Sequence, residues 1–201
     1  ETLEKKYGVA WIVTRIRVDI DRLPKWDEEI LIETWPLEPG KIEFDRDFLV
    51  KDASGKTIIR AISKWVIMDI KERKIKRSEL IGIKYPENIT ERAIEAKLGR
   101  LKDSGQLEVA YKKVIGYSDI DFNGHLNNSK YVDYIMDCFP VAEHKKHALR
   151  SVDLNFMHEA LPGDTLILLK DVSKADEGVI YIEGINNKDD RAVFKSRITI
   201  D

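Results

Sequence analysis

The chain has 201 residues, of which 43% are hydrophobic and 35% are charged, and its formal net charge is −2. This length suits one large domain or two small ones, and the hydrophobic content is enough for a core. Because nucleic-acid-binding proteins usually carry a strong basic excess, the balanced charge argues against a general nucleic-acid partner. No apolar run approaches the roughly 20 residues that a membrane-spanning helix needs.

Four segments of the first half have the β-branched, partly alternating pattern of strands: residues 10–20, 29–35, 42–51 and 57–70. The turn at Asp52–Lys56 contains Gly55, which favours a hairpin, so we expect an antiparallel meander. The basic run Lys71–Arg77 is predicted to be a solvated turn, with contact to an acidic partner as the alternative. We expect a short helix within Pro86–Lys97 and a linker over 101–106.

The second half is predicted to contain one helix and five strands. Tyr131, Ile135 and Phe139 recur at helical spacing, which predicts a helix from about Asn127 to Ala148 that Pro140 must kink or interrupt. The strands are predicted over residues 108–116, 151–157, 165–171, 178–185 and 191–200.

The two halves of the sequence repeat each other. Val18-Asp19-Ile20 followed by a Leu-Pro loop matches Val152-Asp153-Leu154 followed by Leu161-Pro162. The repeat offset of about 130 residues places the counterpart of 117–140 before Glu1, so the first unit should lack its N-terminal strand and helix or keep only the helix tail in residues 1–8. We therefore predict an α+β fold with two copies of a helix-plus-antiparallel-sheet unit. The domains are predicted at residues 1–98 and 108–201, with a linker at 99–107.

A polar cluster, DIDFNGHLNN at 119–128, lies between a predicted strand and the predicted helix. Asn123-Gly124 alone is typical of a simple hairpin turn, but the density of Asp, Asn and His beside a helix start favours a site. Backbone N–H groups at the helix start, together with Asn123, can stabilise an oxyanion. His125 can order the loop or move a proton, and Asp121 can orient its neighbours or act as nucleophile or base. Glu159 by itself would be interpreted as a solvated loop residue.

Other residues receive more ordinary interpretations. The single cysteine, Cys138, is predicted to be a buried small apolar residue, and a lone cysteine suits a reducing, cytoplasmic location. His144 and His147 could form a metal pair, although no third ligand is evident, and His158 could tune Glu159. No phosphate loop, dinucleotide motif or zinc ligand set is found, so no cofactor is expected. Four tryptophans are predicted to pack in the core or on strand faces: Trp11, Trp26, Trp35 and Trp65.

The motif DIDFNGHLNNSKYVDYIMD at 119–137 resembles that of the acyl-acyl carrier protein thioesterases, in the plant and bacterial branch with tandem hotdog domains. The similarity extends to residues 11–36 and 152–164, and so to both halves of the chain. It implies active residues at four matching positions: Asp121, Asn123, His125 and Glu159. Plant members commonly have a cysteine after this glutamate. Here the residue is Ala160, which excludes a thiol nucleophile there and favours water positioned by Glu159 or a carboxylate mechanism through Asp121.

The resemblance implies a hydrolase that releases free fatty acid from acyl carrier protein without a cofactor. The first unit would line the acyl tunnel, the second would hold the catalytic residues, and a homodimer is possible. An acyl-CoA thioesterase of the same fold, and a non-catalytic acyl-binding or carrier-binding hotdog protein, remain alternatives. The acidic carrier protein should dock on basic residues, for which the candidates are Lys112, Lys113, Lys130, Lys145 and Lys146.

Overall fold

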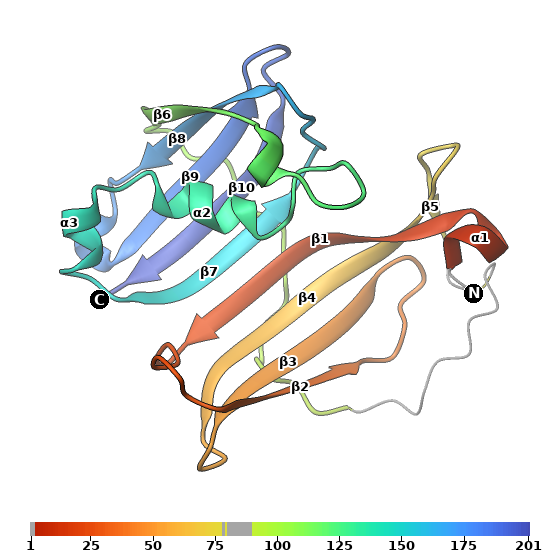
Figure 1. Cartoon of the computed structure of the whole chain (residues 1–201), viewed down its shortest axis with the longest axis horizontal. Helices are drawn as coiled ribbons and strands as arrows, with labels where there is room; N and C mark the ends of the chain where they lie inside the picture. The colour runs from red at the N-terminus through yellow and green to blue at the C-terminus, as the bar shows by residue number, and fades with distance from the viewer. Residues whose placement is uncertain (1–2, 78, 80–89) are drawn as a thin grey trace. The chain divides into compact units, whose positions relative to one another are not determined.

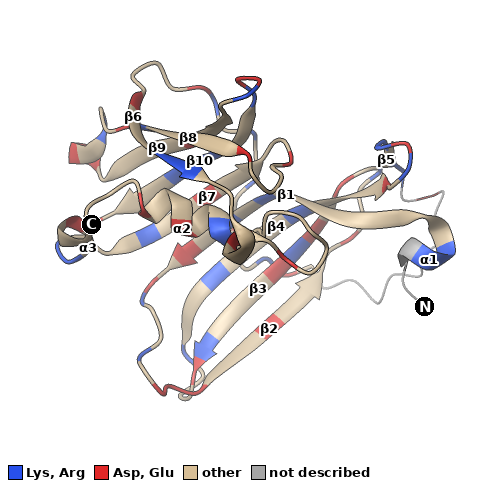
Figure 2. Ribbon diagram, turned by 45° about the horizontal axis from the view of Figure 1, so that its top comes forward, with Lys and Arg blue, Asp and Glu red and all other residues tan. Residues whose placement is uncertain are grey.

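The computed structural model describes residues 3–77, 79 and 90–201, and the chain divides into two units, residues 1–99 and 100–201. Within each unit, neighbouring strands pair in antiparallel fashion (Figure 1). Acidic and basic residues are interspersed along the strands of both units, as the balanced composition suggests (Figure 2). No helix in the described part of the chain has the length and apolarity needed to cross a bilayer.

The sheet of the first unit has the strand order β2-β3-β4-β1, with a short strand β5 paired to β4. A five-residue helix, α1 (Leu3–Tyr7), precedes it. The four predicted strands are confirmed, with bounds within two residues of the prediction. The basic run after β4 begins as an exposed turn, as predicted, but two of its residues form the short strand β5. The strands are β1 (Val9–Ile20), β2 (Ile30–Pro36), β3 (Phe44–Asp52), β4 (Thr57–Asp69) and β5 (Ile75–Lys76).

The second sheet has the order β8-β9-β10-β7, with β6 added beside β8. This is the order of β2-β3-β4-β1 in the first unit, so the repeat seen in the sequence is also a repeat of strand topology. The five predicted strands are confirmed with small differences at their ends. They are β6 (Glu108–Val114), β7 (Leu149–Phe156), β8 (Thr165–Asp171), β9 (Val179–Asn186) and β10 (Ala192–Ile200).

The helix predicted over 127–148 is much shorter in the structure. It consists of α2 (Lys130–Met136) and a separate turn, α3 (Val141–His144). Pro140 explains the break, because it disfavours helical backbone at Phe139, and Pro140 itself is extended with ψ 147°. At the other end, the Asn127 side chain accepts the N–H of Ser129 at 2.9 Å and so holds a turn ahead of the helix.

Helix α2 lies against the second sheet (Figure 1), and its Tyr131 contacts residues of that sheet. Its ring meets those of Phe156 and Phe194 edge-to-face, with centroids 5.2 and 5.3 Å away. Gly184 on β9 makes room for the Phe194 ring, because a Cβ at this position would lie 2.3 Å from it. These edge-to-face aromatic contacts thus hold the helix, and the loop before it, on the sheet.

Residues 90–97, which follow the first sheet in the chain, are hydrogen-bonded to that sheet. The Asp47 carboxylate, fully buried, accepts hydrogen bonds from Arg92 Nε at 3.0 Å and from the Ala93 N–H at 2.8 Å. Trp35 Nε1 also donates to the Glu91 carbonyl at 2.9 Å. Because these backbone groups bond to the sheet, residues 90–97 hold no helix, and the predicted helix is wrong there. Residues 86–89 of that prediction lie outside the described residues.

The predicted linker at 101–106 is tied to the second unit by side chains. The Leu101 N–H donates to Asn155 Oδ1 at 2.8 Å, and Asp103 pairs with Lys195. This segment is therefore bonded to the second unit and is not an unattached linker.

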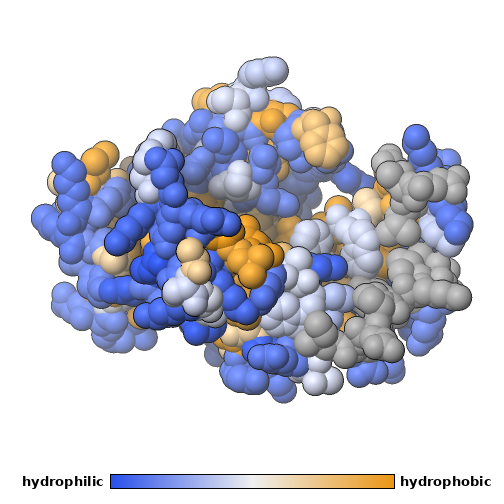
Figure 3. Space-filling model, turned by 60° about the horizontal axis from the view of Figure 1, so that its bottom comes forward, coloured by the Kyte–Doolittle hydropathy of each residue, from blue (hydrophilic) through white to orange (hydrophobic). Residues whose placement is uncertain are grey.

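Three of the four tryptophans pack as predicted, and Trp26 does not. Trp35 is 8% exposed, and Trp11 and Trp65 pack on a core cluster that includes Phe44. Trp26 is 93% exposed because the loop between β1 and β2 carries it away from the sheet. Hydrophobic residues also form patches among hydrophilic ones on the face shown in Figure 3.

Candidate active site

The polar cluster between β6 and α2 forms a tight turn. Ile120 and Leu126 pair as an antiparallel bridge, and the Asp121 N–H donates to the His125 carbonyl at 2.9 Å. Gly124 has φ 81°, a left-handed conformation that glycine adopts without strain. Asn123-Gly124 was interpreted from sequence either as a simple turn or as part of a site. The two interpretations are compatible, because the turn exposes the polar side chains to solvent.

Asp121 holds this turn together from inside. Its Oδ1 accepts the main-chain N–H of Asn123 at 2.8 Å and that of His125 at 3.2 Å. Desolvation raises the pKa of Asp121, but the N–H groups of His125 and Asn123 and the Asn123 side chain outweigh it, so the pKa lies below the usual value. Asp121 is thus an ionised acceptor that holds the backbone of the turn.

His125 and Glu159 are brought together from two separate loops. His125 Nε2 lies 3.0 Å from Glu159 Oε1, and the two side chains are 53% and 31% exposed. Glu159 is fixed by its neighbours: Ala160 is only 1% exposed, and the N–H groups of Met157 and His158 donate to the Val193 carbonyl. Glu159 is therefore held in place by its loop, and both side chains of the pair remain accessible to solvent.

Asn123 occupies the exposed tip of the turn. Its main-chain N–H is bound to Asp121, and its carboxamide also interacts with that carboxylate. The tip is held in place while the side chain stays accessible to a substrate.

The start of α2 offers fewer donors than the sequence suggested. The N–H of Ser129 is bound to the Asn127 side chain, that of Lys130 to the Asn127 carbonyl at 2.9 Å, and that of Val132 to the Ser129 carbonyl at 3.1 Å. These three groups already have partners within the turn, which is the usual way a helix start satisfies its donors.

The other histidines and the cysteine are not part of this site. His144 Nε2 contacts the Met136 carbonyl, His147 Nδ1 the Asp201 carbonyl and His158 Nδ1 the Ala192 carbonyl, at 3.1, 2.7 and 2.8 Å. Within the described residues, no group of three or more His, Cys, Asp or Glu side chains could hold a metal ion. Cys138 is 6% exposed, as predicted, and burial raises its pKa to about 12.

A residue that the sequence reasoning left without a role lies beneath the turn. Asp119 is 4% exposed and pairs with Lys113 at 3.0 Å. In the sequence, Asp119 is distinguished only by its place in the polar cluster. There it resembles a solvated loop residue, because a second aspartate, Asp121, follows two residues later.

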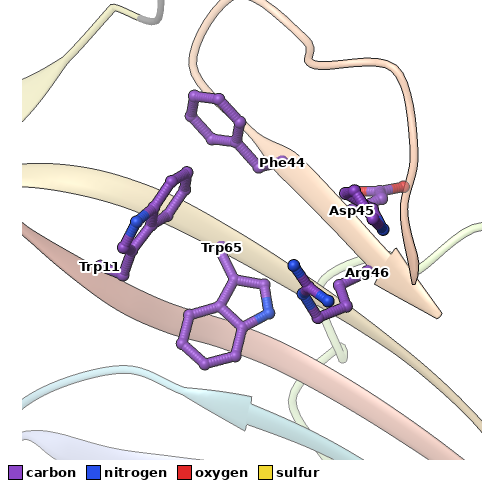
Figure 4. A pocket seen from close by; sticks show the side chains of 6 residues that line it. Trp11, Phe44, Asp45, Arg46 and Trp65 are labelled. Carbon is purple, nitrogen blue, oxygen red and sulfur yellow. The ribbon is translucent and has the colours of Figure 1, made fainter. Parts of the chain in front are cut away.

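The first unit contains an aromatic pocket of its own (Figure 4). Its volume is about 230 Å³, and the rings of Trp11 and Phe44 meet edge-to-face with centroids 4.7 Å apart. Arg46 reaches the same pocket and donates to Thr34 Oγ1 at 3.2 Å. The lining consists of Trp11, Pro36, Phe44, Asp45, Arg46 and Trp65.

Both halves of the chain match known protein-family models. The family model of the acyl-ACP thioesterase N-terminal domain matches residues 1–80, and that of the C-terminal domain matches residues 102–200. The palmitoyl-acyl carrier protein thioesterase of Arabidopsis thaliana is 31% identical over 186 residues, which are 89% of this chain and 45% of that protein. The chain spans about half the length of the curated relatives it matches.

Solved structures agree with the family models. An acyl-ACP thioesterase from Bacteroides thetaiotaomicron superimposes with a TM-score of 0.85 at 26% identity, over 98% of this chain and 79% of that one. The 12:0-ACP thioesterase from Umbellularia californica gives a TM-score of 0.82 at 25% identity, over 98% and 77%. With matching sequence models over both units, and with Asp121, Asn123, His125 and Glu159 grouped on two loops of the second, the chain belongs to the acyl-ACP thioesterase family.

Proposed function

We propose that this chain hydrolyses fatty acyl thioesters of acyl carrier protein and releases free fatty acid. The observation that carries the proposal is the 3.0 Å contact between His125 Nε2 and Glu159 Oε1 in a member of this family. A solvent-accessible carboxylate oriented by an imidazole is suited to positioning and deprotonating water.

The reaction follows from this arrangement. Glu159, ordered by His125, takes a proton from water while the water oxygen attacks the thioester carbonyl carbon. The carbonyl oxygen becomes an oxyanion, which the Asn123 carboxamide stabilises from the tip of the turn. The C–S bond then breaks, the sulfur leaves with the proton that Glu159 accepted, and the products are a free acid and the carrier thiol. Asp121 keeps the turn in shape throughout.

We also infer that both units are hotdog domains in tandem. The shared strand order and the packing of α2 on the second sheet support this arrangement. In this interpretation α1 is the tail of the first unit's helix, and the aromatic pocket of the first unit receives part of the acyl chain. A volume of about 230 Å³ holds about eight groups of water or methylene size at roughly 30 Å³ each.

The docking of the acidic carrier protein is assigned to the exposed lysines of the second unit. Lys113, Lys130 and Lys146 are engaged with Asp119, Asp133 and Glu143, each at about 3 Å, so they contribute less free charge than the sequence alone indicates. Lys112 and Lys145 are exposed, and charge reversal there should raise KM for carrier-protein esters. Matching acyl-CoA esters, which lack the protein surface, should show no such change. The cytoplasmic location and the homodimer remain predictions.

The test is release of free thiol from a chain-length series of acyl carrier protein thioesters, with matching acyl-CoAs alongside. We expect turnover on the carrier-protein esters, and a loss of roughly two to three orders of magnitude in Glu159→Ala and in Asn123→Ala. Glu177→Ala and Asn187→Ala are the controls, because each changes an exposed residue of the same type in the same unit. Both should keep parental rates.

Other outcomes would overturn the proposal. Turnover confined to acyl-CoA would indicate an acyl-CoA thioesterase of the same fold. Tight acyl binding without turnover on either series would indicate a binding protein. Parental rates in Glu159→Ala would remove the proposed role of that carboxylate.

A further inference from the structure

A buried carboxylate that takes no part in the proposed reaction lies at the base of the catalytic turn. Asp119 Oδ2 accepts the Gly116 N–H at 2.8 Å, and the Asp119 carbonyl accepts the Asn127 N–H at 2.9 Å. Gly116 precedes the turn and Asn127 follows it. One residue therefore holds both ends of the segment that carries Asp121 and His125.

The same carboxylate connects the turn to the strand and to the helix. Lys113 of β6 lies 3.0 Å from Asp119 Oδ2, and its ammonium is 5.3 Å from the centre of the Tyr134 ring on α2. Tyr134 is 2% exposed, and its carbonyl accepts the Tyr111 hydroxyl of β6 at 3.0 Å. Three elements thus meet around Asp119.

Burial of this carboxylate is compensated by its partners. Desolvation raises the pKa of Asp119, but the Gly116 N–H and the Lys113 ammonium outweigh it, and the pKa lies below the usual value. An ionised group in this place accepts short, directional hydrogen bonds, which fix backbone geometry better than packing alone.

We propose that Asp119 is a positioning residue, which together with Lys113 sets the orientation of His125 toward Glu159 by clamping the two ends of the catalytic turn. This inference rests on the proposed thioesterase function. It differs from a purely stabilising ion pair in one respect: a change at Asp119 should alter the His125 ring and the rate constant while the protein remains folded.

The experiment compares Asp119→Asn with a matched change on a neighbouring helix. Asp119→Asn keeps the size and one acceptor oxygen but removes the charge, so the pairing with Lys113 is lost. Asp133→Asn is the control, because Asp133 also pairs with a lysine at 3.0 Å but is 59% exposed. Circular dichroism and a thermal melt establish that each variant is folded at the assay temperature.

Two readouts are needed, and one does not depend on turnover. We expect Asp119→Asn to lower kcat by about tenfold or more, with KM changed less than twofold, since small displacements of catalytic groups reduce the rate of the chemical step. The ¹⁵N resonances of the His125 imidazole should shift in Asp119→Asn, and also in Lys113→Met, while Asp133→Asn leaves both readouts at parental values.

The outcomes separate the two proposals. If the parent protein has no turnover but the His125 resonances still shift, the thioesterase assignment fails and the clamp stands as a structural finding. Unchanged His125 resonances in folded Asp119→Asn overturn the positioning role, as does a parental kcat. If Asp119→Asn is unfolded, Lys113→Met is the test. Unchanged His125 resonances in folded Lys113→Met then overturn the clamp.

Discussion

His125 Nε2 and Glu159 Oε1 lie 3.0 Å apart, although the two residues belong to different loops of the second unit. One loop precedes α2, and the other joins β7 to β8. The contact depends on the packing of α2 on the sheet, because that packing sets the distance between the loops. The site therefore forms only in the folded unit, and the His125–Glu159 contact can be tested by changing the two residues separately and together.

The His125–Glu159 pair should behave as one functional unit. We expect His125→Ala and Glu159→Ala each to lower kcat by about 10² or more, and the double variant to be little worse than the poorer single variant. The physical reason is that Glu159 without His125 loses the orientation that makes it effective. Steady-state kinetics on one acyl carrier protein ester would check this, and losses that multiply would show that the two residues act independently.

The aromatic pocket should influence which acyl chain is accepted. Trp65→Leu enlarges the pocket, so we expect the preferred chain to become longer or bulkier. Trp26→Leu is the matched control, because Trp26 is 93% exposed and the same atoms are removed. The measurement is kcat/KM across the chain-length series. An identical profile in Trp65→Leu and the parent would exclude this pocket from chain selection.

Gly184 should tolerate no larger residue. A Cβ added there would lie 2.3 Å from the Phe194 ring, and Phe194 supports Tyr131 of α2. We expect Gly184→Ala to destabilise the fold by about 1–3 kcal/mol, the usual cost of overpacking. Urea denaturation would measure it, with Gly105→Ala as control because a Cβ there meets no atom within 4 Å. Equal midpoints for the two variants would contradict the packing role.

The first unit should lose stability in acid through an ion-pair network. Arg22 contacts Glu28 at 2.6 Å and Asp52 at 2.8 Å. The Arg22 hydrogen bond lowers the pKa of Glu28 to about 2, and mainly the Ser54 hydrogen bond, with Arg22, lowers that of Asp52 to about 2. Both folded pKa values lie below the unfolded ones, about 4.3 and 3.9, so the stabilisation is complete above about pH 4.5 and is lost as pH falls toward 2.

Thermal melts as a function of pH would test this network. Glu28→Gln should lower Tm at pH 7, and the difference from the parent should shrink as the pH approaches 2. Glu29→Gln changes the adjacent exposed carboxylate and should lower Tm little at any pH. A difference between Glu28→Gln and the parent that does not depend on pH would exclude the proposed linkage.

Local chemistry was enough to predict most elements of this protein. Alternating β-branched residues determine the strands, because a sheet half buried on one face needs that period. The internal repeat was visible in Val18-Asp19-Ile20 and Val152-Asp153-Leu154, and the two sheets share one strand order. Three of the four candidate site residues were chosen from a motif whose residues must agree in order, and Glu159 was chosen from the resemblance to the family. Their catalytic roles remain predictions.

Tertiary structure decided what depends on partners distant in sequence. The predicted interruption of the 127–148 helix at Pro140 is confirmed, but the helical segments are shorter than predicted, because the Asn127 side chain bonds to the Ser129 N–H ahead of α2 and α3 ends at His144. Residues 90–97 hold no helix, because the Ala93 N–H bonds to Asp47 of the sheet. Spacing could not show that Glu159 meets His125. Nor could it show that Asp119 is buried, since burial and contact between loops are set by how α2 packs on the second sheet.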